Sequence, residues 1–368
     1  MRLLWMVGGT PRCDAGKRDV SFRRRLVRLG SGTVLFVVEG MKYKATILLT
    51  LTAIFGLALS HMLSGSTNID WGELGLWFSS EPTIAGTVFF EVRLPRVLIA
   101  IAAGAGLGIS GLMMQTWFHN PLAGPSVLGV TSGAGMAVAL VVLTGMGGGW
   151  LANALAASVG SWCALGLVLF VASRFRGLAS LLIFGLMLNY LLGALVTVLQ
   201  AEAEENALQQ FVFWGMGTFG QASLVTASAV LVLVLAASSI AFKQHENLDK
   251  WTLGAVTARS MGVNESRLQR LLVVLTGLLA GSITAVCGPV AFLGLATPHL
   301  VKLLIPYRSH SRLIPMTALI GALLALLADW GVKGWGMAES GWPLNAVLSM
   351  LGAPLVIWVL LQRNFSRS

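Results

Sequence analysis

The sequence predicts an all-α, polytopic membrane protein with about ten membrane-spanning helices. Of its 368 residues, 56% are hydrophobic and only 11% are charged, and the mean hydropathy is +0.79. A soluble domain carries about 25% charged residues. Apolar runs recur along the chain, and a run of about twenty residues crosses a bilayer core of roughly 30 Å as a helix. The alternating pattern over about ten residues that marks membrane β-strands is absent from the sequence.

The first 44 residues are strongly basic, with ten Lys and Arg against three acids. Two interpretations are open. Residues 1–44 form a basic cytoplasmic tail, or translation begins at Met41, because MKYKATILLTLTAIFGLAL places a short basic flank directly before a span. The remainder is predicted to be one ten-helix transmembrane domain over residues 45–363, followed by a short cytoplasmic tail over residues 364–368.

Each predicted span is an apolar run bounded by charged residues or by glycine and proline. The eighth is short and contains Pro298, so it is the least regular of the set. The predicted spans are 46–63, 94–116, 126–145, 150–172, 180–200, 222–242, 268–287, 292–306, 313–332 and 343–361.

The stretch from Arg93 to Gly135 is the most informative in the chain. It opens with RLPR and continues as an uncharged run in which Gly104 and Gly108 have the spacing of a close helix–helix contact. Asn120-Pro121 then breaks the run before a second apolar segment begins. Irregular backbone at membrane depth needs protein or water to satisfy its polar groups, so this break predicts the wall of a pathway.

The basic residues are distributed asymmetrically between the two sides of the membrane. With the N-terminus in the cytoplasm, 22 of the 25 Lys and Arg fall on the cytoplasmic side, which fits an even number of spans and two cytoplasmic termini. The outer side keeps Arg93, Arg96 and Lys333. These cations either reach the interface and anchor helix ends, or they form a positive patch for carboxylates of a partner that docks from outside.

The largest cytoplasmic loop, Phe242 to Arg270, separates the sixth and seventh predicted spans. Its centre, Leu253 to Met261, predicts a short helix between two glycines. The small residues Ala255 and Ala258 predict a flat face that the groove of another protein would accept. The alternative is an ordinary interfacial helix.

Several function classes are disfavoured by their missing motifs. The segment 106–111 matches the dinucleotide fingerprint formally, but it lies inside a span rather than at a strand-to-helix turn. The three cysteines are scattered, without the spacing of a zinc or redox site. The positive charge lies in loops on one side of the membrane and does not indicate a nucleic-acid partner. We therefore predict a protein that is not an enzyme and has no cofactor and no metal.

Ionisable groups at membrane depth are few. His119 and His299 stand beside prolines and are expected to form hydrogen bonds with the backbone, and Asp329 has no obvious partner. An ion-coupled secondary transporter of a small solute would be expected to hold paired carboxylates or a broken-helix ion site in its spans. Because Asp329 has no obvious partner, the sequence favours a transporter that draws its energy from another polypeptide. The ion-coupled secondary transporter is the alternative.

Five sequence blocks stand in order over roughly Lys42 to Arg363. They are RLPRVLIAIAAGAGLGISGLMMQ, NPLAGPSVLGVTSGAG, LGAVTARSMGV, GPVAFLGLATPHLVKLL and LGAPLVIWVLL. Together these blocks resemble the FecCD (BtuC-like) permeases. The resemblance implies the fold of a BtuC-like (type II) ABC importer permease in the bacterial inner membrane. It also implies a second, identical or homologous permease subunit, two ABC ATPase subunits, and a periplasmic or lipoprotein solute-binding protein. An iron–siderophore is the implied substrate, with haem and cobalamin open.

The resemblance also assigns roles by position. Arg93, Arg96 and Lys333 match the residues that meet the binding protein, although lysine replaces the arginine that the family often shows, so bidentate geometry is lost at that position. The implied coupling helix that contacts the ATPase includes Leu253, Gly254, Ala255, Ala258, Arg259 and Gly262. The implied inner gate comprises Gly177, Leu178, Ala179 and Ser180. The polar candidates for the pathway are Asn189 and Tyr190, and Asn189 equally fits a hydrogen bond between packed helices.

Overall fold

The computed structural model describes residues 43–63, 84–146, 149–174, 178–305, 309–333 and 341–365. Within these residues all regular structure is helical, which confirms the predicted all-α fold class. The chain divides into two compact units, residues 1–49 and 50–368, and the elements discussed below belong to the second. Of the predicted tails over 1–44 and 364–368, residues 1–42 and 366–368 lie outside the described residues, and so does the question of a start at Met41.

Among the described residues, seven helices are long and apolar enough to cross a membrane. Three shorter apolar helices lie where the third, eighth and tenth spans are predicted. Twelve residues, as in Leu293–Leu304, rise only about 18 Å as an α-helix, so the count of ten spans is not confirmed. The seven long helices are Tyr43–Leu63, Ile84–Trp117, Trp150–Ala172, Ser180–Ala201, Leu224–Lys243, Glu265–Cys287 and His310–Val332.

Two boundaries differ clearly from the prediction. The second span begins at Ile84 instead of residue 94, because α3 (Ile84–Thr87) and a π-helical turn, η1 (Val88–Arg93), continue directly into α4 (Leu94–Trp117). The sequence also predicts no helix between residues 200 and 222, where the structure has α8 (Glu205–Met216). Both segments carry charged or amide side chains that a search for uninterrupted apolar runs passes over.

The other helices follow in chain order, joined by short connections. They are η2 (Pro125–Leu128), α5 (Val130–Leu143), α6 (Trp150–Arg174), α7 (Leu178–Ala201), α9 (Leu224–Lys243), α10 (His245–Trp251), α11 (Ala255–Ser260), α12 (Glu265–Cys287), α13 (Leu293–Leu304), α14 (His310–Val332) and α15 (Leu344–Phe365).

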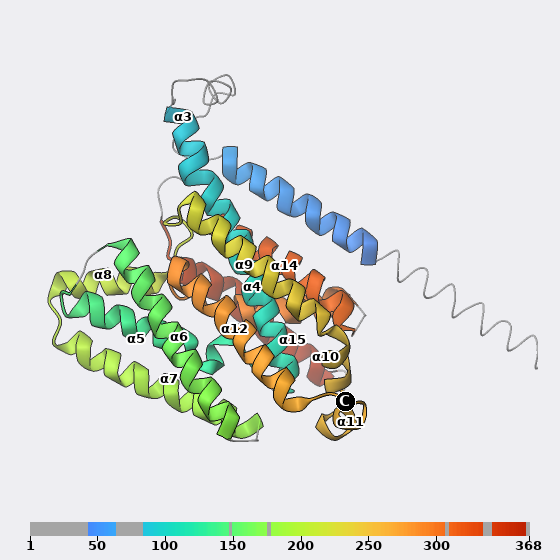
Figure 1. Cartoon of the computed structure of the whole chain (residues 1–368). Coiled ribbons are helices and arrows are strands. Elements are labelled where there is room, and N and C mark those ends of the chain that lie inside the picture. Colours follow the sequence, from blue (N-terminus) through green and yellow to red (C-terminus); the bar gives the residue numbers. More distant parts are fainter. Residues whose placement is uncertain are drawn as a thin grey trace, which may run out of the picture. The chain divides into compact units, whose positions relative to one another are not determined.

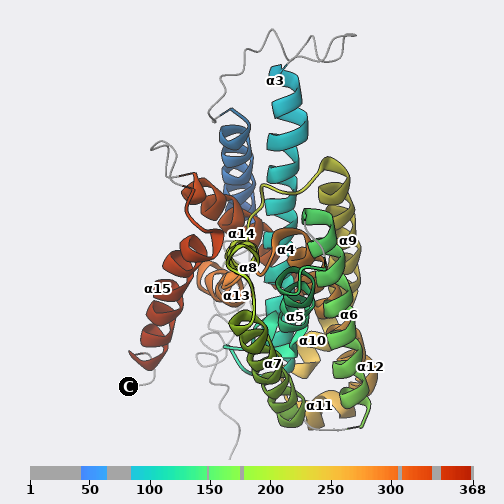
Figure 2. The ribbon, with the colours of Figure 1, turned by 90° about the vertical axis from the view of Figure 1, so that its left-hand side faces the viewer.

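Helix α4 forms the centre of the packing and contacts α9, α12, α13 and α14 (Figure 1). Its glycines permit this. A Cβ on Gly104 would meet the backbone of Gly321 in α14, and one on Gly111 would meet the backbone of Gly294 in α13. The predicted glycine-mediated contact is therefore confirmed, and the helices approach as closely as small residues allow. Helix α7 packs against α5, α6 and η2 instead (Figure 2).

Candidate functional site

Two segments without α-helix lie between α-helices inside the protein. The first joins α4 to α5 and contains η2, and the second, residues 288–292, joins α12 to α13. His299 shares a hydrogen bond of 2.8 Å with the carbonyl of Pro121, and His119 shares one of 3.0 Å with the carbonyl of Trp251. The prediction that both histidines bond to backbone is confirmed. The broken backbone is thus held by protein groups, as its depth in the fold requires.

A cavity of about 340 Å³ lies between these two segments. Its lining is mostly apolar, with the hydroxyl groups of Ser126, Thr131 and Thr284 as polar exceptions. Leu122 comes from the first segment, and Phe292 from the second. A cavity of this size and character is in the usual range for a small-molecule site.

Helix α7 is fastened to the first segment by Asn189. Its Nδ2 donates to the carbonyl of Ser126 at 3.1 Å, and its Oδ1 accepts from the Ser132 hydroxyl at 2.8 Å. Asn189 therefore forms hydrogen bonds between packed elements, at the rim of the cavity. Tyr190, the other polar candidate for the pathway, is 73% exposed on the same helix.

Helix α15 is fastened to the second segment in the same way by Asn345. Its Oδ1 accepts from the backbone N–H of Ala291 at 2.9 Å, and its Nδ2 donates to the carbonyls of Pro289 and Gly215 at 2.8 and 3.0 Å. Asn345 was not among the residues selected from the sequence. Its signal was available, because an amide side chain within a predicted apolar span is the same feature that marked Asn189.

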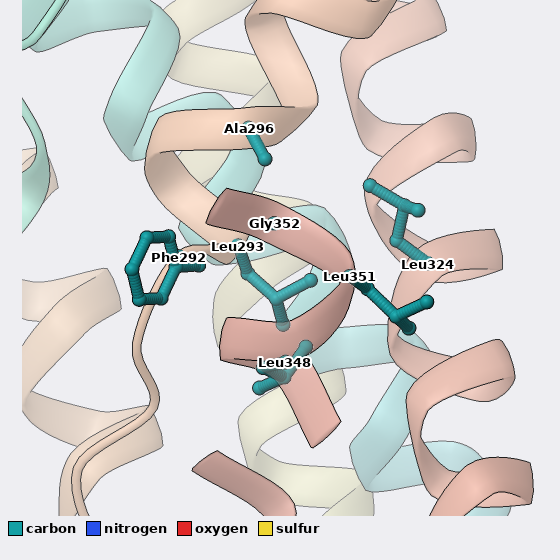
Figure 3. A pocket seen from close by; sticks show the side chains of 7 residues that line it. All are labelled: Phe292, Leu293, Ala296, Leu324, Leu348, Leu351 and Gly352. Atoms are coloured by element: carbon teal, nitrogen blue, oxygen red, sulfur yellow. The ribbon is translucent and has the colours of Figure 1, made fainter. Parts of the chain in front are cut away.

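Phe292 lines both this cavity and a second, smaller hollow of about 20 Å³, whose lining residues are drawn in Figure 3. Its backbone is left-handed, with φ of 62°, a conformation that is uncommon for a bulky residue and concentrated at functional sites. The ring lies against Gly352 of α15, where an added Cβ would come within 2.8 Å of the Phe292 Cβ and 3.1 Å of its Cγ. Leu348 and Leu351 of α15 and Leu324 of α14 complete the smaller hollow.

A cluster of charged groups joins α4, α14 and the end of the helix Tyr43–Leu63. Arg96 donates to both carboxylate oxygens of Asp329, from Nη2 at 2.8 Å and from Nε at 2.9 Å, and His61 Nδ1 lies 3.4 Å from the same carboxylate. The sequence predicts no partner for Asp329, and that prediction is wrong. The partner is 233 residues away, a separation that no local pattern reveals.

The three cations predicted to face outward lie close together around this carboxylate. Arg93 is only 6% exposed and donates to the carbonyls of Met62 and Leu63, at the C-terminal end of their helix. Such carbonyls lack intrahelical partners and attract cations. Lys333 follows α14, and burial together with the charges of Arg96 and Arg93 lowers its pKa to about 8 despite the attraction of Asp329. Whether these residues contact a binding protein stays a prediction.

Helix α11 forms at the predicted place, with Gly254 and Gly262 in positive-φ conformations, 99° and 84°, on either side. The predicted flat face is wrong, because Ala258 is fully buried within the chain. The exposed apolar side chains of this region are Leu253, Val256 and Met261, at 61%, 78% and 46% exposure.

The comparisons with known proteins now place the chain. The FecCD transport family model matches residues 48–362. The chain belongs to the FecCD transport family. The hemin transport system permease protein HmuU of Yersinia pestis is 34% identical over 326 residues, 87% of this chain and 96% of the relative. The vitamin B12 import system permease protein BtuC of Salmonella typhimurium is 35% identical over 311 residues, 83% of this chain and 92% of the relative.

A solved structure supports the same assignment. A metal-chelate type ABC transporter in an inward-facing conformation superimposes with a TM-score of 0.76 at 29% identity, covering 87% of this chain and 99% of the other. The chain therefore has the fold of a multi-span ABC importer permease. The prediction of a transport permease rather than an enzyme is confirmed by these relatives.

The predicted gate of this FecCD permease is only partly described. Gly177 lies outside the described residues. Leu178, Ala179 and Ser180 form the first turn of α7, and Ser180 is exposed. The role of this turn stays a prediction.

Proposed function

We propose that this chain is one of two permease subunits of an ABC importer that moves a large metal chelate across the bacterial cytoplasmic membrane. The cavity between the two broken segments carries the proposal. Similarity to permeases of hemin and vitamin B12 import systems and to a metal-chelate type transporter supports a chelate as cargo. A smooth apolar lining with few hydroxyl groups suits a bulky rigid cargo, because a site with many strong contacts would retain it.

The path is proposed to follow the faces of α7 and α15. Asn189 and Asn345 hold the two broken segments to these helices, so each helix carries one wall of the cavity. Much of α7 is apolar and exposed, with Met187 at 54% and Leu191 at 58%. A second permease subunit, identical or homologous, would cover this face and complete the path. A movement of α7 relative to α15 would then widen or narrow the cavity.

Energy is proposed to come from two separate ABC ATPase subunits on the cytoplasmic side, where both termini are also expected. The exposed residues Leu253, Val256 and Met261 of the α11 region provide an apolar surface that is suited to a groove on an ATPase. On the outer side, Lys333 and the 22%-exposed side chain of Arg96 are the cations available to acidic residues of a solute-binding protein. Arg93 is more deeply committed to helix-end carbonyls.

The test is uptake by liposomes that contain the permease with its ATPase, supplied with the binding protein. Ferric siderophore, hemin and cobalamin are offered in turn, with ATP inside or absent. We expect uptake of one chelate, dependent on ATP and unaffected by an uncoupler. Uptake that an uncoupler abolishes and that proceeds without ATP would instead support the ion-coupled secondary transporter. A Lys333→Glu variant should bind the binding protein more weakly, and increasingly so at low salt.

A further inference from the structure

Helix α10 connects the proposed ATPase-contacting helix to the core of the permease. It covers His245–Trp251, and only three residues separate it from α11. Leu248 and Trp251 of α10 are fully buried. Helix α10 contacts α4, α9 and α14 as well as α11, so it can transmit a displacement of α11 to these helices, beside the route through α12, to which the exposed Arg259–Glu265 ion pair joins α11.

One side of α10 is bound to the start of α14 through Asp249. This carboxylate accepts from the backbone N–H of His310 at 2.8 Å, from His310 Nδ1 at 2.6 Å and from the Ser309 hydroxyl at 2.7 Å. His310 is 2% exposed, and its Nε2 lies 2.9 Å from the hydroxyl of Thr116 at the end of α4. Since a carboxylate only accepts, Nδ1 donates, and in the neutral ring Nε2 accepts from Thr116.

The end of α10 is bound to α4 through Trp251. Its ring stacks on Trp117 with centroids 4.2 Å apart, and its Nε1 donates to the Trp117 carbonyl at 3.1 Å. Both indoles are fully buried. A stacked, buried and hydrogen-bonded pair of this kind resists separation in any direction.

Helices α4 and α14 are then tied together over their whole length. Thr116 pairs with His310, a Cβ on Gly108 would lie 3.1 Å from Thr317, and Gly104 meets Gly321 backbone to backbone. The antiparallel register ends at the opposite side of the membrane with Arg96 on Asp329. The residue numbers fall along α4 as they rise along α14, so the two helices form one continuous pair.

We propose that α10, α4 and α14 move as one rigid body, which transmits a displacement of α11 to the outer end of the permease. Asp249 is the positioning residue in this body, because its carboxylate holds α10 to the start of α14. The proposal rests on the proposed ATPase contact at α11. Helix α7 is outside this body, because it packs against α5, α6 and η2. The movement that opens or closes the cavity would therefore occur between the rigid body and α7.

The test uses spin labels in the complex of permease and ATPase in liposomes. One label replaces Thr257, an exposed residue next to the buried Ala258 of α11. The second label replaces either Val92, 50% exposed at the outer end of the rigid body, or Glu202, exposed just beyond α7. Cys13 and Cys163 are replaced by serine, and the third cysteine, Cys287, is only 1% exposed, so that the label reacts at the chosen positions.

Binding of ATP under conditions that block hydrolysis should change the Thr257–Glu202 distance and leave the Thr257–Val92 distance constant. Asp249→Ala should make the Thr257–Val92 distance broad and dependent on nucleotide. Asp249→Glu, which keeps the carboxylate, should restore most of the constancy. Glu246→Ala is the matched control, because Glu246 is an exposed acid on the same helix and should behave as wild type. If Asp249→Ala does not fold, Ser309→Ala weakens the same attachment more gently.

Each outcome bears on a separate claim. A Thr257–Val92 distance that varies with ATP in the wild type, or that stays constant in Asp249→Ala, would overturn the rigid-body proposal while the ATPase contact stands. Failure of the wild-type permease to retain the ATPase would instead overturn the proposed function, and this inference with it.

Discussion

Helices α4 and α7 are almost equally apolar, yet they occupy opposite environments. In the most apolar window of the helix Ile84–Trp117, 89% of the residues are buried within the chain, against 17% in the window of Ser180–Ala201. The difference lies in the small residues. Gly104 and Gly111 of α4 meet the backbones of two neighbouring helices, whereas in α7 only Gly185 meets neighbouring backbone, at Val127, and a Cβ added to Gly193 would have no neighbouring atom within 4 Å. Hydropathy predicts that both helices enter the membrane, and packing decides which one is the scaffold.

The comparison also separates what holds from what moves. Helix α4 is tied to α14 by an ion pair, by close glycine contacts and by a histidine, and these contacts lie at both ends and in the middle. Helix α7 is held to the rim of the cavity by the hydrogen bonds of one side chain, Asn189, and by the close contact of Gly185 with the backbone of Val127. An alternating-access transporter requires one helix that is held by many contacts and another that is held by few.

The largest expected effect is on the ion pair at the outer end of α4. Asp329→Ala leaves the Arg96 guanidinium without its carboxylate in a buried site, and loss of one partner of such a pair costs about 3–5 kcal/mol. The midpoint temperature of thermal unfolding of the detergent-solubilised chain should fall strongly. The control is Glu265→Ala at the exposed pair with Arg259, which is expected to cost about 0–1 kcal/mol. Equal shifts in the two variants would show that α4 does not depend on this tie.

The next effect tests the glycine contacts directly. Gly111→Ala places a methyl group against the backbone of Gly294, so the two helices must separate, at a cost of about 1–3 kcal/mol for overpacking. Gly193→Ala in α7 meets open space and should be neutral or slightly stabilising. The measurement is the unfolding midpoint of both variants under identical conditions. A larger loss at Gly193 than at Gly111 would reverse the comparison between the two helices.

A smaller effect on stability and a clearer effect on transport are expected at the two asparagines. Asn345→Ala removes three hydrogen bonds and Asn189→Ala removes two, each worth about 1 kcal/mol. Both variants should slow ATP-driven uptake, because the broken segments lose their connection to α15 and α7. Thr197→Ala is the control on α7, since its hydroxyl bonds only to the carbonyl of Gly193 within the same helix. Wild-type uptake in both asparagine variants would argue against their role at the cavity walls.

The smallest effect on stability is expected when the pH is lowered, at the contact between Asp249 of α10 and the start of α14. Burial tends to raise the pKa of Asp249, but hydrogen bonds from His310 and Ser309 outweigh it and hold that pKa below its usual value. The stabilising contribution of Asp249 is therefore complete above the unfolded-state pKa of about 3.9 and is lost as pH falls through the lower folded-state value. The difference in unfolding midpoint between wild type and Asp249→Asn should narrow as the pH falls below 4. A difference that does not narrow there would show that the Asp249 carboxylate does not control this attachment.

The sequence predicted the parts of this fold that depend on local pattern. Long apolar runs, the glycine spacing in α4 and the two glycines around α11 each reflect a requirement that neighbouring residues express. The partner of Asp329 and the partners of Asn345 could not be predicted, because these contacts join segments far apart in the chain, although the amide of Asn345 in a predicted span could have been selected as a candidate. The buried side of α11 was also missed, since a six-residue helix is too short for its periodicity to show which face is covered.

The account depends most on the claim that this chain forms a passage and that another polypeptide supplies the energy. The direct measurement is accumulation of the transported chelate in liposomes that contain the purified chain alone, compared with liposomes that also contain its ATPase and internal ATP. We predict accumulation against a gradient only in the second case, with none when the ATPase cannot hydrolyse ATP. Sustained uphill uptake by the chain alone would contradict the account.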